Sequence, residues 1–162
     1  MTTKENNGRE IALDVLTEVL ENGAFVHVAL SRALFKYQYL EKQERAFITR
    51  VTDGTIERLL PIDQALSMCS AVPVKKMKPF IRTLLRMSAY QILFMDRVPD
   101  SAVCNEAVKL AVRRKFAGLK GFVNGVLRSV SRRKEEFDFR EPSLKYSMPQ
   151  WLIDRWERDY GL

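Results

Sequence analysis

Histidine and cysteine are scarce in this chain of 162 residues, which contains one histidine, His27, and two cysteines, Cys69 and Cys104. A serine or cysteine nucleophile of the usual kind needs a histidine base, and a single histidine offers no such arrangement. Two cysteines give neither a disulfide framework nor the spacing of a metal site, so we expect both to act as small apolar side chains. Asp53 and Glu106 stand alone within helical patterns, where a salt bridge or a cap explains them. No glycine-rich phosphate loop is present, and the sequence predicts no catalytic residue, metal ligand or cofactor site in this chain.

Long apolar runs are also missing. Residues 1–8 are polar and lack the apolar stretch of a secretory signal. The most apolar segment, 81–95, is interrupted by Arg82 and Arg86 and is too short to cross a bilayer. We therefore expect a cytoplasmic protein without a membrane partner.

Acidic residues are absent from residues 107–134, although the whole chain contains 20 Asp+Glu. Nine of the 27 Lys+Arg lie in this stretch, which leaves 18 basic residues against 20 acidic ones elsewhere. A concentrated basic face on an otherwise balanced domain is typical of a protein that binds a polyanion, most often a nucleic acid. The candidate RNA-binding residues are the nine basic residues of the stretch: Lys109, Arg113, Arg114, Lys115, Lys120, Arg128, Arg132, Arg133 and Lys134.

Two structural explanations for the same charges remain open at this point. A helix surface that faces solvent is often rich in lysine and arginine without binding anything. Basic residues in the last turn of a helix also complement the helix dipole, which would account for Arg113, Arg114 and Lys115.

The hydrophobic periodicity is helical almost throughout. Apolar residues recur at helical spacing in segments that begin near residues 11, 26, 42, 61, 79, 101 and 122, with proline or glycine between most of them. No two alternating apolar segments are joined by a hairpin turn. We therefore predict an all-α bundle of about seven helices.

Two local features bear on how these helices begin and pack. Gly54 falls inside the third pattern and costs about 1 kcal/mol relative to alanine in a helix. We expect either that another helix approaches it closely or that residues 52–54 form a turn. Asp100 and Ser101 follow a Val-Pro break and are candidate N-caps of the next helix.

The segment Gly118-Leu-Lys-Gly121 resembles the short clamp loop of KH-type RNA binders. That loop needs strands around it, and the sequence predicts none. We interpret the segment as a turn between two helices, with Lys120 still available to a phosphate.

Several segments together resemble the NusB-type RNA-binding domain. They are 81–93, 98–99, 102–111 and 120–128, preceded by Ala46-Phe47 and Asp53-Gly54, and Phe122-Val-Asn-Gly-Val-Leu-Arg128 is the most specific. The resemblance covers roughly residues 9–134 and implies an all-α RNA-binding bundle. Asn124 and Arg128 match the family motif. We interpret Asn124 as holding a helix turn or an interhelical hydrogen bond and not as reading a base.

The tail distinguishes between two groups within this resemblance. One is the free transcription antitermination factor, and the other is the N-terminal domain of a ribosomal RNA small subunit methyltransferase that makes 5-methylcytosine. Segment 147–161 resembles the connector that opens the methyltransferase half. The resemblance implies an RNA-binding domain at 1–134, a linker at 135–147 and an amphipathic helix at 148–162, whose Trp151 and Trp156 would contact the methyltransferase domain. The catalytic cysteines and the S-adenosylmethionine site that it implies would lie beyond residue 162.

Three functions are compatible with these features. The leading hypothesis is that the chain docks small-subunit ribosomal RNA and presents it to the separate catalytic domain of an rRNA cytosine-C5 methyltransferase, without being catalytic itself. The second is an antitermination-type module of transcription regulation, which binds RNA jointly with a ribosomal protein. The third is a protein-interaction bundle that forms a homodimer.

Overall fold

All regular secondary structure in the computed structural model, which describes residues 8–137, is helical. The α-helices are α1 (Gly8–Leu20), α2 (Val26–Lys36), α3 (Lys42–Glu57), α4 (Leu59–Cys69), α5 (Pro79–Phe94), α6 (Asp100–Arg113) and α7 (Lys120–Arg133), and the short 3₁₀ helices are η2 (Val74–Lys76), η3 (Ala117–Leu119) and η4 (Lys134–Glu136). No strand occurs among residues 8–137. The prediction of an all-α bundle of about seven helices is confirmed. Most of the predicted linker and the helix with Trp151 and Trp156 lie outside the described residues.

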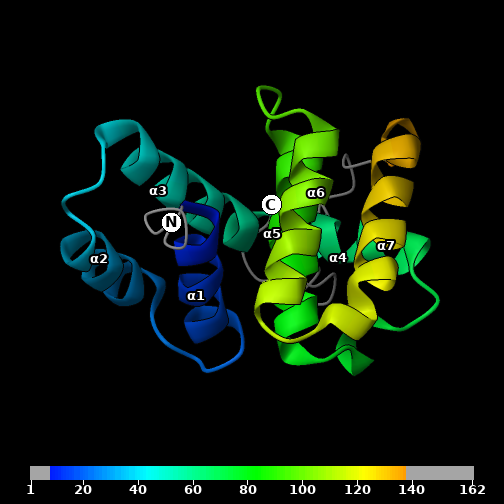
Figure 1. The fold of residues 1–162 in the computed structure, drawn as a ribbon, viewed down its shortest axis with the longest axis horizontal. Helices are drawn as coiled ribbons and strands as arrows, with labels where there is room; N and C mark the ends of the chain where they lie inside the picture. Colours follow the sequence, from blue (N-terminus) through cyan, green and yellow to red (C-terminus); the bar gives the residue numbers. More distant parts are fainter. Residues whose placement is uncertain (1–7, 138–162) are drawn as a thin grey trace, which may run out of the picture.

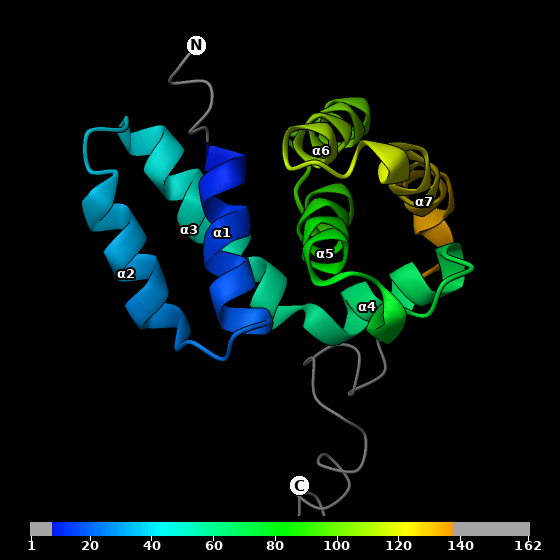
Figure 2. The same ribbon diagram turned by 60° about the horizontal axis from the view of Figure 1, so that its bottom comes forward.

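The helices form two groups, which Figures 1 and 2 show side by side. Helices α1, α2 and α3 make up one group and α5, α6 and α7 the other, while α4 leads from α3 to the second group. The groups are joined because α1 and α3 both pack against α5. None of the helices described between residues 8 and 137 has the length and apolarity that a membrane span requires.

Helix α5 is central, as its hydrophobicity predicts. Ten of its residues are buried, and they face more than one neighbouring helix. Leu84 and Leu85 are both fully buried although they are adjacent in sequence. A helix that is apolar on most sides belongs in the interior of a bundle.

Gly54 lies inside α3 and not in a turn, so the expectation of a close helix approach is correct. The side chain of Tyr90, on α5, occupies the space that a Cβ atom at residue 54 would need. The contact between α3 and α5 therefore explains why glycine stands here despite its low helix propensity.

Two predicted helix starts differ from the structure. Helix α4 begins at Leu59, before Pro61, because proline fits the first turn of a helix, where its missing N–H is not needed. Helix α6 begins at Asp100 with Pro99 at the N-cap, so neither Asp100 nor Ser101 caps it. The carboxylate of Asp100 instead accepts a hydrogen bond from Ser131 Oγ at 2.5 Å.

Candidate nucleic-acid interface

The two adjacent arginines at the end of α6 pair with acidic residues of α1. Arg113 Nη1 lies 2.7 Å from Glu10 Oε1, and Arg114 Nε lies 2.9 Å from Glu10 Oε2. Arg114 Nη2 also lies 2.8 Å from Asp14 Oδ1. The Glu10 side chain is only 11% exposed. A carboxylate buried to this extent needs its cationic partners, so Arg113 and Arg114 hold α1 against α6.

Three more of the predicted RNA-binding residues also pair with carboxylates. Lys134 Nζ lies 3.0 Å from Asp100 Oδ2, and Arg133 Nε lies 3.0 Å from Glu136 Oε1. Lys109 Nζ lies 3.5 Å from Glu106 Oε2, in an exposed pair on the surface of α6. The pair confirms that a salt bridge accounts for Glu106. The absence of acids from residues 107–134 therefore does not mean that these cations are unpaired in space.

The other four cations have no acidic partner among the described residues. Lys115, Lys120, Arg128 and Arg132 are all exposed. Arg128 Nε donates to Asn124 Oδ1 at 3.2 Å, and Arg128 Nη2 reaches Asn105 Oδ1 on α6 at 3.4 Å. Asn124 therefore orients a neighbouring arginine, in agreement with the structural role expected for it.

The sequence prediction missed three exposed lysines that lie near the start of α7. Lys75 and Lys76 lie in helix η2 and Lys78 follows it; all three are exposed and have no acidic partner within residues 8–137. Their signal in the sequence is the short segment Val74-Lys-Lys-Met-Lys78, which contains no acid. It is too short to stand out beside the longer stretch at 107–134.

An apolar pocket of about 230 Å³ lies between these lysines and the start of α7. Its lining comes from two stretches that are distant in sequence, 72–81 and 119–122. The apolar part consists of Val72, Met77, Ile81, Leu119 and Phe122, while Lys76 and Lys78 also line it. Phe80 and Phe116 stack with their ring centroids 5.0 Å apart, and this contact joins the start of α5 to the segment before η3. We call Lys75, Lys76, Lys78 and Lys120 the lysine rim, because each lines the pocket or is adjacent in sequence to a residue that does.

Helix α7 begins beside this pocket, and its exposed face extends away from the pocket. Gly121, Gly125, Arg128 and Arg132 follow a spacing of four, three and four residues, which puts them on one side of a helix. A Cβ atom at Gly121 or Gly125 would meet open space, and neither residue has a positive φ. Neither glycine is therefore required by packing or by backbone conformation, although Gly125, in the helix interior, costs about 1 kcal/mol of helix stability relative to alanine. The result is a helix face with no side chain at two positions, followed by two arginines that have no acidic partner among the described residues.

The remaining candidates for chemistry lie elsewhere and are separate from one another. His27 is exposed beside Phe25, and Cys104 is buried in α6, where burial raises the pKa of its thiol. Within residues 8–137 no group of histidine, cysteine and acidic side chains could hold a metal ion. The described surface instead offers exposed cations around an apolar pocket, which suits a polyanion with flat apolar parts.

Comparison with known proteins gives three results. The sequence model of the NusB family matches residues 6–132. The chain is 34% identical to the probable ribosomal RNA small subunit methyltransferase B of Bacillus subtilis, over 98% of this chain and 36% of that protein, and 31% identical to its Synechocystis counterpart, over 96% and 36%. It therefore spans about a third of the length of these relatives.

The solved structures with a similar fold are more distant in sequence. One is NusB from a crystal structure of the antitermination factors NusB and NusE with double-stranded RNA, with a TM-score of 0.72, 17% identity and coverage of 82% of this chain and 98% of that one. Thermotoga maritima NusB has a TM-score of 0.69 and 21% identity, over 80% and 94% of the two chains. At these identities the likeness establishes the fold alone.

Proposed function

This chain belongs to the NusB family, and we propose that it docks small-subunit ribosomal RNA for a methyltransferase of which it forms the N-terminal domain. The observation that carries the proposal is the lysine rim around the apolar pocket, with Lys115 and the exposed face of α7 beside it. Of the nine basic residues predicted from the sequence, Lys115, Lys120, Arg128 and Arg132 remain as RNA contacts. Lys75, Lys76 and Lys78 join them.

The chemistry of the surface favours RNA with an unpaired or looped segment. Lysine ammonium groups contact phosphates as point charges without a fixed geometry, and such contacts position a nucleic acid without reading its sequence. An unpaired base could enter the apolar pocket and stack against Phe122, because proteins recognise single-stranded RNA largely by stacking. A paired helix would offer no free base to this pocket.

The catalytic part of the proposed function lies outside this chain. The relatives named as methyltransferases are almost three times as long as the matched region. We place the cytosine-C5 methyl transfer and its S-adenosylmethionine site in that further part. Segment 148–162, with Trp151 and Trp156, would connect the RNA-binding bundle to it.

Replacing two pocket lysines tests the proposal. We expect Lys76→Gln/Lys78→Gln to weaken binding of a ribosomal RNA hairpin, as measured by fluorescence anisotropy across a salt series. If each lysine meets one phosphate of a single-stranded segment, the slope of log affinity against log salt should decrease in magnitude by about 1.4.

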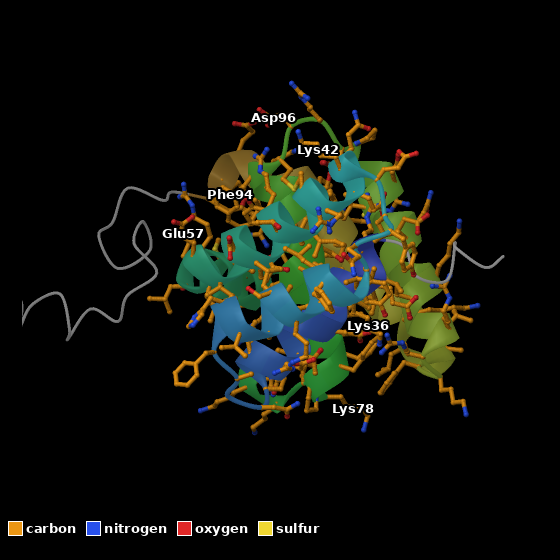
Figure 3. All side chains as sticks on the ribbon, turned by 90° about the vertical axis from the view of Figure 1, so that its left-hand side faces the viewer. Lys36, Lys42, Glu57, Lys78, Phe94 and Asp96 are labelled. Carbon is orange, nitrogen blue, oxygen red and sulfur yellow. The ribbon has the colours of Figure 1, made fainter. Side chains whose placement is uncertain are left out.

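The matched control removes the same charge from another face. Lys36→Gln/Lys42→Gln changes two exposed lysines of α2 and α3, neither of which lines the pocket, and Figure 3 labels both on these helices. This variant should bind RNA as the wild type does. Equal losses in both variants would mean that only net charge matters, and no loss in either would exclude the lysine rim as an RNA surface.

The outer face of α2 favours a second candidate function, protein binding. Phe25 and Phe35 are 75% and 73% exposed, and Tyr39 is 66% exposed, so large apolar side chains face solvent around this helix. Such a face suits contact with a second copy or, in an antitermination-type module, with a ribosomal protein. A mass that rises with concentration in sedimentation experiments would support self-association, and a constant monomer mass would exclude a homodimer.

A further inference from the structure

We propose that Arg82 is a positioning residue, which holds the segment around η2 so that Lys75, Lys76 and Lys78 can contact RNA. The inference rests on the proposed function of the lysine rim. It concerns a partly buried arginine that lies outside the basic stretch 107–134.

The guanidinium of Arg82 donates hydrogen bonds to backbone carbonyls of the lysine segment. Its Nη1 atom lies 3.3 Å from the carbonyl oxygen of Val74, 3.1 Å from that of Lys75 and 3.4 Å from that of Met77. Val74 and Met77 are buried, whereas the three lysines beside them are exposed. The backbone is therefore tied to the interior on both sides of Lys75 and Lys76 and at the residue before Lys78.

Glu21 fixes Arg82 from the opposite side. Arg82 Nε donates to Glu21 Oε2 at 2.9 Å, and Arg82 Nη2 donates to Glu21 Oε1 at 2.7 Å. The two side chains are only 16% and 11% exposed. The pKa of the Glu21 carboxyl lies below its usual value, chiefly because Arg82 donates hydrogen bonds to it. A planar guanidinium can satisfy a carboxylate and a set of carbonyls at once, which a lysine ammonium cannot do in the same geometry.

Arg86 belongs to the same ionic network but does not contact the lysine segment. It forms two hydrogen bonds with Asp63, at 2.8 and 2.9 Å, and lies 3.8 Å from Glu21 Oε2. Arg82 and Arg86 therefore both lie on α5, both have low exposure, and both contact Glu21. They differ in that Arg82 alone binds the carbonyls around η2.

That difference gives a matched test of the inference. Arg82→Lys should weaken RNA binding by about tenfold, because the lysines lose their common orientation. Arg86→Lys should lower the free energy of unfolding but leave the RNA affinity of the folded protein within about twofold of the wild type. Both variants are measured by anisotropy with the RNA hairpin and by urea unfolding.

A double-mutant cycle separates positioning from general stability. In a background of Lys75→Gln/Lys76→Gln/Lys78→Gln, Arg82→Lys should have less than a twofold further effect on RNA affinity, because the groups that it positions are gone. An equal loss in both backgrounds would show that Arg82 acts through the fold and would overturn the inference. If Arg82→Lys fails to fold, Glu21→Gln enters the same cycle, because it weakens the hold on Arg82 with little change in size.

The outcomes also distinguish this inference from the proposed function. If the triple glutamine variant binds RNA as the wild type does, the lysine rim is not an RNA surface and both proposals fail. If the triple variant binds weakly and Arg82→Lys binds normally, only the role of Arg82 is refuted.

Discussion

The arginines at the end of α6 and the lysines around the apolar pocket are both concentrated positive charge, yet they have different surroundings. Arg113 and Arg114 contact Glu10 and Asp14 at 2.7 to 2.9 Å, whereas the described residues provide no acidic partner for Lys76 and Lys78. Arginine suits fixed bidentate contact with a carboxylate, and lysine suits a mobile contact with a phosphate. A run of basic residues therefore marks a binding surface only where the tertiary structure leaves the charges unpaired.

Reversing the paired arginines should have the largest effect on stability. Arg113→Glu/Arg114→Glu removes these two cations from the buried Glu10 and adds two acids beside it. We expect the free energy of unfolding to fall by about 3 kcal/mol, measured by urea denaturation. Arg132→Glu is the control, because this arginine is exposed without an acidic partner and should affect RNA affinity much more than stability. A charge-reversed pair with wild-type stability and no RNA binding would place these arginines in the interface.

A negative charge added at the pocket should lower RNA affinity and leave the stability of the fold almost unchanged. Val72 lines the pocket and is 37% exposed, so Val72→Glu adds a carboxylate beside Lys76 and Lys78 with little cost to the fold. We expect RNA affinity, measured by anisotropy, to fall about tenfold. Val28→Glu changes a residue of similar exposure, 42%, on α2 and should leave RNA binding unchanged. Equal effects of the two substitutions would argue against a local role for the pocket.

A substitution of Gly125 on the exposed face of α7 should change stability and RNA binding in opposite directions. Gly125→Ala adds a methyl group in open space and should raise the free energy of unfolding by about 1 kcal/mol. The same methyl group should weaken RNA binding if the sugar–phosphate backbone lies against this face. Gly54→Ala is the structural counterpart and should be destabilising, because its methyl group would overlap Tyr90. Tighter RNA binding by Gly125→Ala would remove this face from the interface.

The smallest expected effect is on the pH dependence of the unfolding free energy, through the pairing of Glu21 with Arg82. Glu21 has a pKa below its usual value of 4.5 in the folded chain, chiefly because of hydrogen bonds from Arg82. A lowered folded pKa stabilises the fold above the unfolded value, and this contribution disappears as pH falls through the folded pKa. The difference in unfolding free energy between the wild type and Glu21→Gln should therefore be constant near neutral pH and shrink below about pH 4.5. A difference that stays constant down to pH 3 would show that the Glu21 charge does not stabilise the fold.

Much of the fold could be predicted because helix positions follow from local patterns. The apolar spacing of Ile11, Val15 and Val19 predicts a buried face. Ile11 and Val15 are buried in α1, and Val19 is partly buried against the core. The helix starts near Pro61 and Asp100 were less accurate, because a cap depends on side-chain contacts such as that of Asp100 with Ser131. Residues 138–162 lie outside the described structure, so the predicted linker and the roles of Trp151 and Trp156 remain predictions.

The candidate site was predicted only in part because pairing between charges is not local. Arg113 and Glu10 are 103 residues apart in sequence, so no window around the arginine contains its partner. Phe122 packs against the core and also lines the pocket with Val72, which belongs to a different segment. Lys76 and Lys78 become significant only because the fold brings them to the start of α7.

The sequence by itself determined the helical class, the buried face of each helix, the family and the excess of positive charge. It could do so because each of these properties depends on neighbouring residues or on the composition of a single stretch. The tertiary structure alone decided which cations are neutralised and which surround an apolar pocket. The physical reason is that Coulomb interactions and hydrogen bonds depend on distance in space, which the packing of α1, α5, α6 and α7 sets.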